Sequence, residues 1–547
     1  MKVKSWQRNG LKPFRAGFFD LILREDTMKI EWTKAPVGRR KFLKGATALG
    51  AAAALPGSLA SRAYAADAGV LRVRAYGDAQ NMDPAHSVGV VEEEVHASIY
   101  NKLIQYKPGR EWDWQMDAAA MIEQGDETHI KFALRDDIGF TNGFGAMSAE
   151  DVKFSFERII ADETESPNKP DMGPLSHVEV TGEREGTIVL KEPFAPLWSI
   201  ALPYITGNIV SKKAVEAAGG RIGSDPVAES GPYLRASWEP KAKTTLKRNP
   251  DWKGEAPAWD TIEILPIDDE NTAEIAFEAG ELDFTRVSLG SVERYRAGVP
   301  NGGTLLEYPS LYYAWLGMNL DHPKLQNKKL RQAIQHAIDV PSVLEAAYFG
   351  AVEPSTGIIA PGLAGNRSQS LVPPQADFEK AAALLAESGE TNVTLKLDTL
   401  NKTTFTTAAQ VIQATLAQIG ITVEVNVLES GAFWASADNE DLQLVLNRYS
   451  MTPDPYYATS WFTTEQVGHW NWERFSNEEF DKIHVSASQL TDQAKRAEMY
   501  QRAQDLMEES GAYRFLTHEA TPVIHSAGVV PALRPDGLAL LRYFGKA

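Results

Sequence analysis

The feature that most constrains the fold is a strand and a turn that follow one another from residue 130 onward. Hydrophobic Ile130, Phe132 and Leu134 alternate with polar or small neighbours, which is the two-residue period of a strand with one buried face. Asn142 and Gly143 then predict a turn, because glycine adopts positive φ at little cost and asparagine tolerates it.

A helix is expected to begin after this turn, at Ser148. Ser148 and Asp151 have the spacing of a capping box, in which the hydroxyl accepts a backbone N–H and the acid lies near the positive end of the helix dipole. Hydrophobic residues then recur at helical spacing and form the expected buried face: Val152, Phe156, Ile159 and Ile160. Strand, turn and helix together predict an α/β scaffold.

A second α/β region is predicted between residues 377 and 425. Asp377 is expected to cap a helix that ends at Gly389, and residues 393–397 alternate as a strand. A helix that stops at Gly420 is followed by another alternating strand at residues 421–425. This order predicts a parallel, right-handed crossover, and open α/β sheets bind ligands beyond the carboxyl ends of their strands.

The first 65 residues differ from the rest of the chain in charge. They hold 13 of the 55 Lys and Arg residues but 4 of the 73 Asp and Glu residues, so the remainder has a net charge of −27. The paired Arg39 and Arg40, the apolar run at 45–60 and the A-x-A spacing at 63–65 resemble a twin-arginine (Tat) export signal over residues 28–65. Met28 is an alternative start, which would make residues 1–27 an upstream extension.

Cysteine is absent from the chain. Disulfides, thiolate metal sites, iron–sulfur ligation and a lipid-modified cysteine tether are therefore excluded. The acidic body repels phosphate backbones, which argues against nucleic acid as a partner. After export we expect the protein to be free in the periplasm.

Motifs of catalysis and phosphate binding are also missing. The sequence has no H-E-x-x-H, G-x-S-x-G, Walker or G-x-G-x-x-G pattern. His518 and Glu519 are adjacent, but the next histidine, His525, follows Pro522, so one helical face cannot hold both histidines. We expect no metal, no cofactor and no enzymatic activity. A dispersed Ser, His and Asp triad, as in a Tat-exported hydrolase, stays open as the alternative of another class.

The order of residues over 134–160 resembles the signature of the family 5 extracellular solute-binding proteins, the peptide/nickel-type receptors of ABC importers. Asn142 stands where the family has Asp, and Met82 stands where it usually has Leu. Further elements occur in the family's order: NMDP at 81–84, YNKL at 100–103, IVSKK at 209–213, GPY at 231–233, GELD at 280–283 and LRQAIQHAID at 330–339.

This resemblance implies an α/β fold of the periplasmic-binding-protein type, a two-lobed Venus flytrap (type II, cluster C) with an extra small domain. Such a protein captures a solute between its lobes and delivers it to inner-membrane permease subunits driven by a cytoplasmic ATPase; we expect a monomer. The implied division is residues 66–103, 222–315 and 513–547 for lobe one, 104–221 for the inserted domain, and 316–512 for lobe two.

The resemblance also implies where the solute is recognised. Family members face their ligand with a strand and loop that correspond here to the run after Leu446, and with aromatic residues on neighbouring segments. The expected ligand-binding residues are Asn447, Arg448, Tyr449, Ser450, Met451, Trp434, Tyr312, Tyr313, Asn81 and Met82.

One of these positions bears on specificity. Peptide-binding relatives place an Asp where this chain has Met451, and that Asp pairs with the amino terminus of the peptide. Arg448 instead offers a guanidinium fork to a carboxylate or phosphate. The expected solute is peptide-like or carboxylate-bearing; a non-peptide solute such as an opine, an oligosaccharide or a metal chelate remains the alternative.

Overall fold

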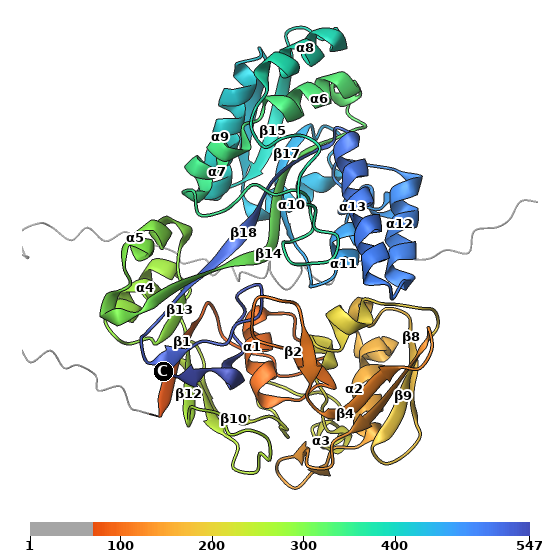
Figure 1. Ribbon diagram of the computed structural model, residues 1–547, viewed down its shortest axis with the longest axis vertical. Coiled ribbons are helices and arrows are strands. Elements are labelled where there is room, and N and C mark those ends of the chain that lie inside the picture. The colour runs from red at the N-terminus through yellow and green to blue at the C-terminus, as the bar shows by residue number, and fades with distance from the viewer. Residues whose placement is uncertain (1–68) are drawn as a thin grey trace, which may run out of the picture. The chain divides into compact units, whose positions relative to one another are not determined.

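A ten-stranded mixed sheet runs through most of the structure (Figure 1). Its first five strands in spatial order are β10 (Tyr233–Glu239), β11 (Lys243–Arg248), β12 (Thr261–Pro266), β1 (Val70–Ala75) and β13 (Phe284–Arg286). The other five are β18 (Tyr513–His525), β14 (Thr304–Met318), β17 (Leu444–Ser450), β15 (Thr394–Leu400) and β16 (Thr422–Leu428).

The computed structural model describes residues 69–547. The expected export signal with Arg39 and Arg40 therefore lies outside the described residues. Within residues 69–547, no helix combines the length and the apolar character that a membrane crossing requires.

Two long strands connect the halves of the sheet. β14 and β18 lie side by side and antiparallel (Figure 1). On its other edge β18 pairs with β13 of the first half, whereas β14 pairs with β17 of the second. Their register shifts between Pro309 and Tyr313 and again between Ala314 and Trp315. Proline has no N–H to donate to a ladder, which is why it is tolerated at such an irregularity.

Three helices belong to the first half: α1 (Val90–Ile99), α4 (Glu270–Glu278) and α5 (Val292–Ala297). The short helix α3 (Lys212–Ala217) precedes β10. β1 and β12 run parallel, with Arg74 opposite Leu265. Their carboxyl ends therefore lie at the same edge of the sheet, where α4 begins.

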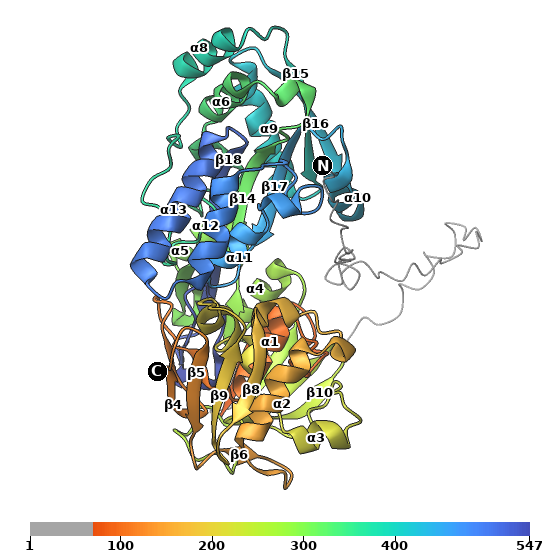
Figure 2. The same ribbon diagram turned by 90° about the vertical axis from the view of Figure 1, so that its right-hand side faces the viewer.

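A separate four-stranded antiparallel sheet forms a small domain with α2 (Ala149–Ile160) against it (Figure 2). The strands are β4 (Ala119–Gln124), β5 (His129–Leu134), β9 (Glu185–Leu190) and β8 (Leu175–Val180). The predicted strand, turn and helix are confirmed: Asn142 has a φ of 58°, and Ser148 and Asp151 form the capping box. Short strands complete the region: β2 (Ile104–Tyr106), β3 (Trp114–Met116), β6 (Gly139–Phe140) and β7 (Gly145–Ala146).

The second half contains the predicted crossover. β15 and β16 are parallel and are joined by α9 (Thr403–Ala417), and Asp377 caps α8 (Phe378–Ser388), which ends at Gly389. The other helices are α6 (Lys328–Ala337), α7 (Val340–Tyr348), α10 (Ser430–Ala435), α11 (Pro455–Ser460), α12 (Glu478–Gln489) and α13 (Gln493–Glu509).

Separate hydrophobic cores lie in the two halves. One core joins β1, β12 and α1 with segments near the C-terminus, whereas others gather residues of β15, β16, α6 and α9 or of β14 and α13. The small domain has a core of its own. The fold is therefore an α/β fold of two lobes, with a small additional domain.

Candidate functional site

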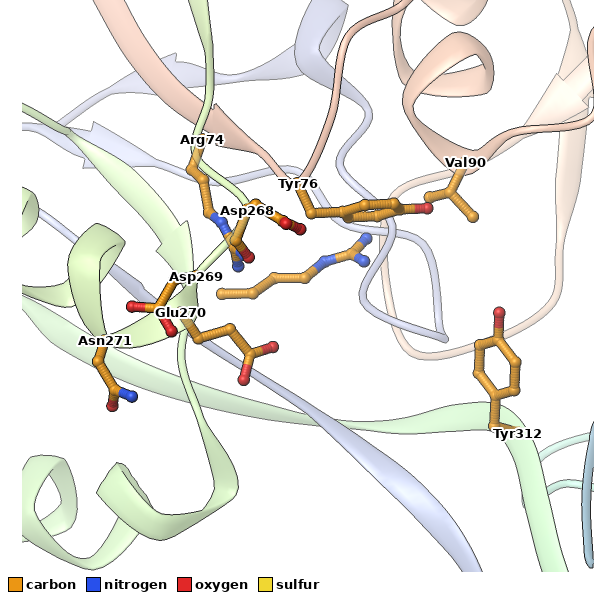
Figure 3. A pocket seen from close by; sticks show the side chains of 9 residues that line it. Arg74, Tyr76, Val90, Asp268, Asp269, Glu270, Asn271 and Tyr312 are labelled. Carbon is orange, nitrogen blue, oxygen red and sulfur yellow. The ribbon is translucent and has the colours of Figure 1, made fainter. Parts of the chain in front are cut away.

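A cavity of about 470 Å³ lies where β1 and β12 end (Figure 3). It is at the place where open α/β sheets bind ligands. Two arginines, three carboxylates and two tyrosines give it charged groups of both signs beside aromatic surface. The residues that line it are Arg74, Tyr76, Val90, Asp268, Asp269, Glu270, Asn271, Arg286 and Tyr312.

Arg74 is the buried cation of this cavity, with 8% of its surface exposed. Its Nε donates to the carbonyl of Ile267 at 2.7 Å and its Nη2 to the carbonyl of Asp268 at 2.7 Å. Both partners are neutral. Burial therefore lowers the pKa of Arg74, although the nearby charge of Glu270 opposes this effect.

The acidic residues come from the start of α4. The carboxylate of Asp269 accepts from the backbone N–H of Thr272 and caps the helix. Asp268 and Glu270 are exposed, and within residues 69–547 no hydrogen bond or ion pair engages their carboxylates. Arg286 is the second cation of the cavity, and its Nη2 lies 3.2 Å from Oε1 of Glu94 on α1. The cavity thus presents charges of both signs.

Tyr76, which follows β1, and Tyr312, on β14, both provide aromatic surface to the cavity (Figure 3). They keep 44% and 37% of their surfaces exposed. Burial of its hydroxyl and the charge of Glu94 raise the pKa of Tyr76 to about 12, so this phenol is neutral at physiological pH.

Arg448 lies on β17, beside Tyr312 of β14. Its Nε and Nη2 each donate to a carboxylate oxygen of Glu519 at 2.7 Å, and its guanidinium lies 3.7 Å from the centre of the Tyr312 ring. Burial acts to lower the pKa of Arg448, but the charge of Glu519 more than offsets it, so the pKa is raised. The fork that the sequence offers to a ligand carboxylate is occupied by a carboxylate of the chain itself.

The predicted aromatic residues of this region lie mainly in a core. Tyr449 is buried, and its hydroxyl donates to the carbonyl of Trp470 at 2.6 Å. Its ring lies 6.4 Å from that of half-buried Trp434 and 4.8 Å from that of Trp315. Tyr313 is also buried and stacks on Trp315.

The remaining predicted residues are dispersed. Asn447 and Met451 are buried, and half-buried Ser450 lies opposite Tyr312 in the β14 and β17 ladder. Met82 is fully buried in the core that contains β1, whereas half-buried Asn81 accepts the backbone N–H of Asp83.

Of the ten predicted residues, Tyr312 lines the cavity and Arg448 and Ser450 lie next to Tyr312. The sequence-based prediction missed Arg74, Tyr76, Asp268 and Glu270. The acidic run after β12 and the rule that ligands bind at carboxyl ends of strands are the signals that could have identified them.

Across residues 69–547, no three His, Asp or Glu side chains come together as ligands of a metal ion.

Two lobes with a polar cavity at the ends of parallel strands define a receptor for a small solute. The sequence profile described as "Bacterial extracellular solute-binding proteins, family 5 Middle" matches residues 116–470. The chain belongs to this family. Its function is that of the solute-binding component of an ABC importer, and family members work with permease and ATPase components.

Three similar proteins illustrate the range of the match. The chain is 25% identical over 459 residues to the probable D,D-dipeptide-binding periplasmic protein DdpA of Escherichia coli K12, covering 80% of this chain and 86% of that protein. It is 25% identical over 510 residues to the glutathione-binding protein GsiB of Shigella flexneri serotype 5b, covering 90% and 96%. The structure of HbpA2 from Haemophilus parasuis has a TM-score of 0.78 at 22% identity and covers 87% of this chain and 100% of that one.

Proposed function

We propose that this chain captures a carboxylate-bearing or peptide-like small solute in the periplasm and catalyses no reaction. The observation that carries the proposal is the cavity at the ends of β1 and β12, where buried Arg74 is held by neutral carbonyls. Among residues 69–547 no carboxylate bonds directly to this guanidinium, and a solute carboxylate would do so. The names of two relatives, for a D,D-dipeptide and for glutathione, support a peptide-like solute.

The proposed site extends from the cavity along β14 to β17. Tyr312 connects the two parts, because it lines the cavity and contacts Arg448. Ser450 and Arg448 then lie beside the solute, whereas the buried predicted residues support the wall behind it. An opine, an oligosaccharide or a metal chelate would use the same cavity as the alternative solute.

Export and assembly complete the proposal. A Tat translocase would carry the folded protein across the inner membrane, and a monomer would then present its solute to the permease. Lobe one would comprise residues 66–103, 222–315 and 513–547, lobe two residues 316–512, and the small domain residues 104–221.

The test is to identify what the protein carries. The purified protein is denatured, the released solute is identified by mass spectrometry, and the refolded protein is titrated with that compound by calorimetry. One solute per chain is expected, together with loss of its uptake in a strain that lacks the gene. Product formation from a substrate panel without stoichiometric binding would instead establish the Tat-exported hydrolase.

A further inference from the structure

We propose that the cavity at the ends of β1 and β12 binds an α-amino-acid head group, in which an ammonium and a carboxylate share one carbon. This inference rests on the proposed function and narrows its solute class. Free amino acids carry this head group, and so do conjugates that are linked through the amino-acid side chain. Ordinary peptides separate the two charges.

The carboxylate of the head group is assigned to Arg74. This side chain is nine-tenths buried and lines the cavity. Its Nε and Nη2 are used by the carbonyls of Ile267 and Asp268, and no described residue accepts from its Nη1. A carboxylate at Nη1 gains a charge-assisted hydrogen bond without displacing any acid of the chain.

The ammonium is assigned to the start of α4. Asp269 is used by the helix cap, which leaves the carboxylates of Asp268 and Glu270 for a ligand. The backbone carbonyl of Asp268 accepts from Nη2 of Arg74 at 2.7 Å, and Glu270 lines the same cavity two residues later, so the cationic and anionic subsites are neighbours. Neighbouring subsites of opposite sign match a head group whose two charges are adjacent.

The charge of the cavity excludes simpler ligands. Three carboxylates and two arginines line it, and Arg286 is also paired with Glu94. A solute with only negative charges would meet repulsion from the acids, and a purely cationic solute would meet Arg74. A head group with one positive and one negative charge can pair with both the carboxylates and Arg74.

An extended peptide fits this arrangement poorly. Its ammonium and carboxylate move apart by about 3.5 Å with each added residue. The rest of a side-chain-linked solute would instead leave the head group and contact the half-exposed rings of Tyr76 and Tyr312, which line the same cavity (Figure 3).

Two isomeric dipeptides distinguish a solute linked through its amino-acid side chain from an ordinary peptide. In γ-L-glutamyl-L-alanine the ammonium and a carboxylate share one carbon, whereas in α-L-glutamyl-L-alanine the same atoms form an ordinary dipeptide of equal net charge. Titration calorimetry with the full-length mature protein is expected to show affinity for the γ isomer that is about tenfold or more above that for the α isomer.

Two variants test whether the preference for the γ isomer arises in the cavity. Glu270→Gln is expected to weaken binding of the γ isomer about tenfold. The matched control is Glu281→Gln, an exposed acid just after the same helix that does not line the cavity, and its affinity is expected to be unchanged. Thermal unfolding of both variants checks that neither has lost its fold.

Equal or tighter binding of the α isomer would overturn the head-group assignment, as would an unchanged affinity of Glu270→Gln. Absence of binding by both isomers and by each of the twenty free L-amino acids would overturn it as well. None of these results removes the receptor function, which fails separately if no solute is released and uptake survives deletion of the gene.

Discussion

Arg74 and Arg448 lie on strands of the same sheet, but they differ in the groups to which their guanidinium nitrogens donate. Arg448 is bound by both oxygens of Glu519. Arg74 is held at the same two nitrogen positions by backbone carbonyls, which carry no net charge. The partner of an arginine, more than its burial, therefore decides whether it attracts an anion.

The first way to break this comparison is to remove each charge and measure binding. Arg74→Gln is expected to weaken binding of the co-purifying solute by about 3 kcal/mol, the upper range for a hydrogen bond to a charged group. The double variant Arg448→Gln/Glu519→Gln removes a neutralised pair and is expected to change affinity by less than about 1 kcal/mol. Calorimetry measures both; a larger loss in the double variant would place the anion subsite at β17.

The second prediction concerns stability. Glu519→Gln is expected to lower the free energy of unfolding by about 2 to 3 kcal/mol, because the mostly buried guanidinium of Arg448 loses its counter-charge. Asp137→Asn is the matched control, since Asp137 forms a similar two-bond pair with Arg135 at the surface. The control is expected to cost about 1 kcal/mol or less. Equal losses in urea unfolding would contradict the importance of burial at Arg448.

The third prediction concerns a buried carboxyl group, Glu473, that forms no ion pair with any cation of residues 69–547. Glu473 is fully buried, accepts from Nε1 of Trp315 at 2.7 Å, and has its pKa raised by burial from 4.5 to about 7. The folded state therefore binds this proton more tightly than the unfolded chain does. Stability is fully present below pH 4.5 and is lost as the pH rises through about 7.

Between pH 5.5 and 8 this group alone is expected to remove about 2 kcal/mol of stability. Glu473→Gln keeps a neutral side chain at every pH, so its unfolding free energy should depend less on pH over this interval. Urea unfolding at the two pH values measures the difference. An identical slope in both proteins would show that Glu473 stays ionised in the fold.

The smallest expected effect belongs to the ring that connects the two arginine sites. Tyr312→Leu removes the face that contacts the Arg448 guanidinium and is expected to cost about 0.5 to 1 kcal/mol of stability. Tyr312→Phe keeps the face and serves as the control. If both variants lose the same stability in thermal unfolding, the hydroxyl rather than the ring face is responsible.

Local structure could be predicted from the sequence because its causes are local. The period of Ile130 to Leu134, the Ser148 cap and the β15, α9 and β16 crossover each depend on neighbouring residues, and each is confirmed. The cavity could not be predicted in this way, since it requires Arg74 and Asp268 to meet through the pairing of β1 with β12. The partner of Arg448 is likewise 71 positions away in the chain.

The register shift between Pro309 and Tyr313 gives a way to detect closure of the lobes around a solute. A two-strand connection bends most readily where its ladder is interrupted, and this interruption ends next to Tyr312. Backbone amides of Ser310 and Leu311 should therefore exchange their hydrogens for deuterium faster than those of Leu316 and Gly317, which pair in register with both β17 and β18 on the same strand. Slower exchange at these two amides on adding solute would be a signal of domain closure that requires no label on the solute.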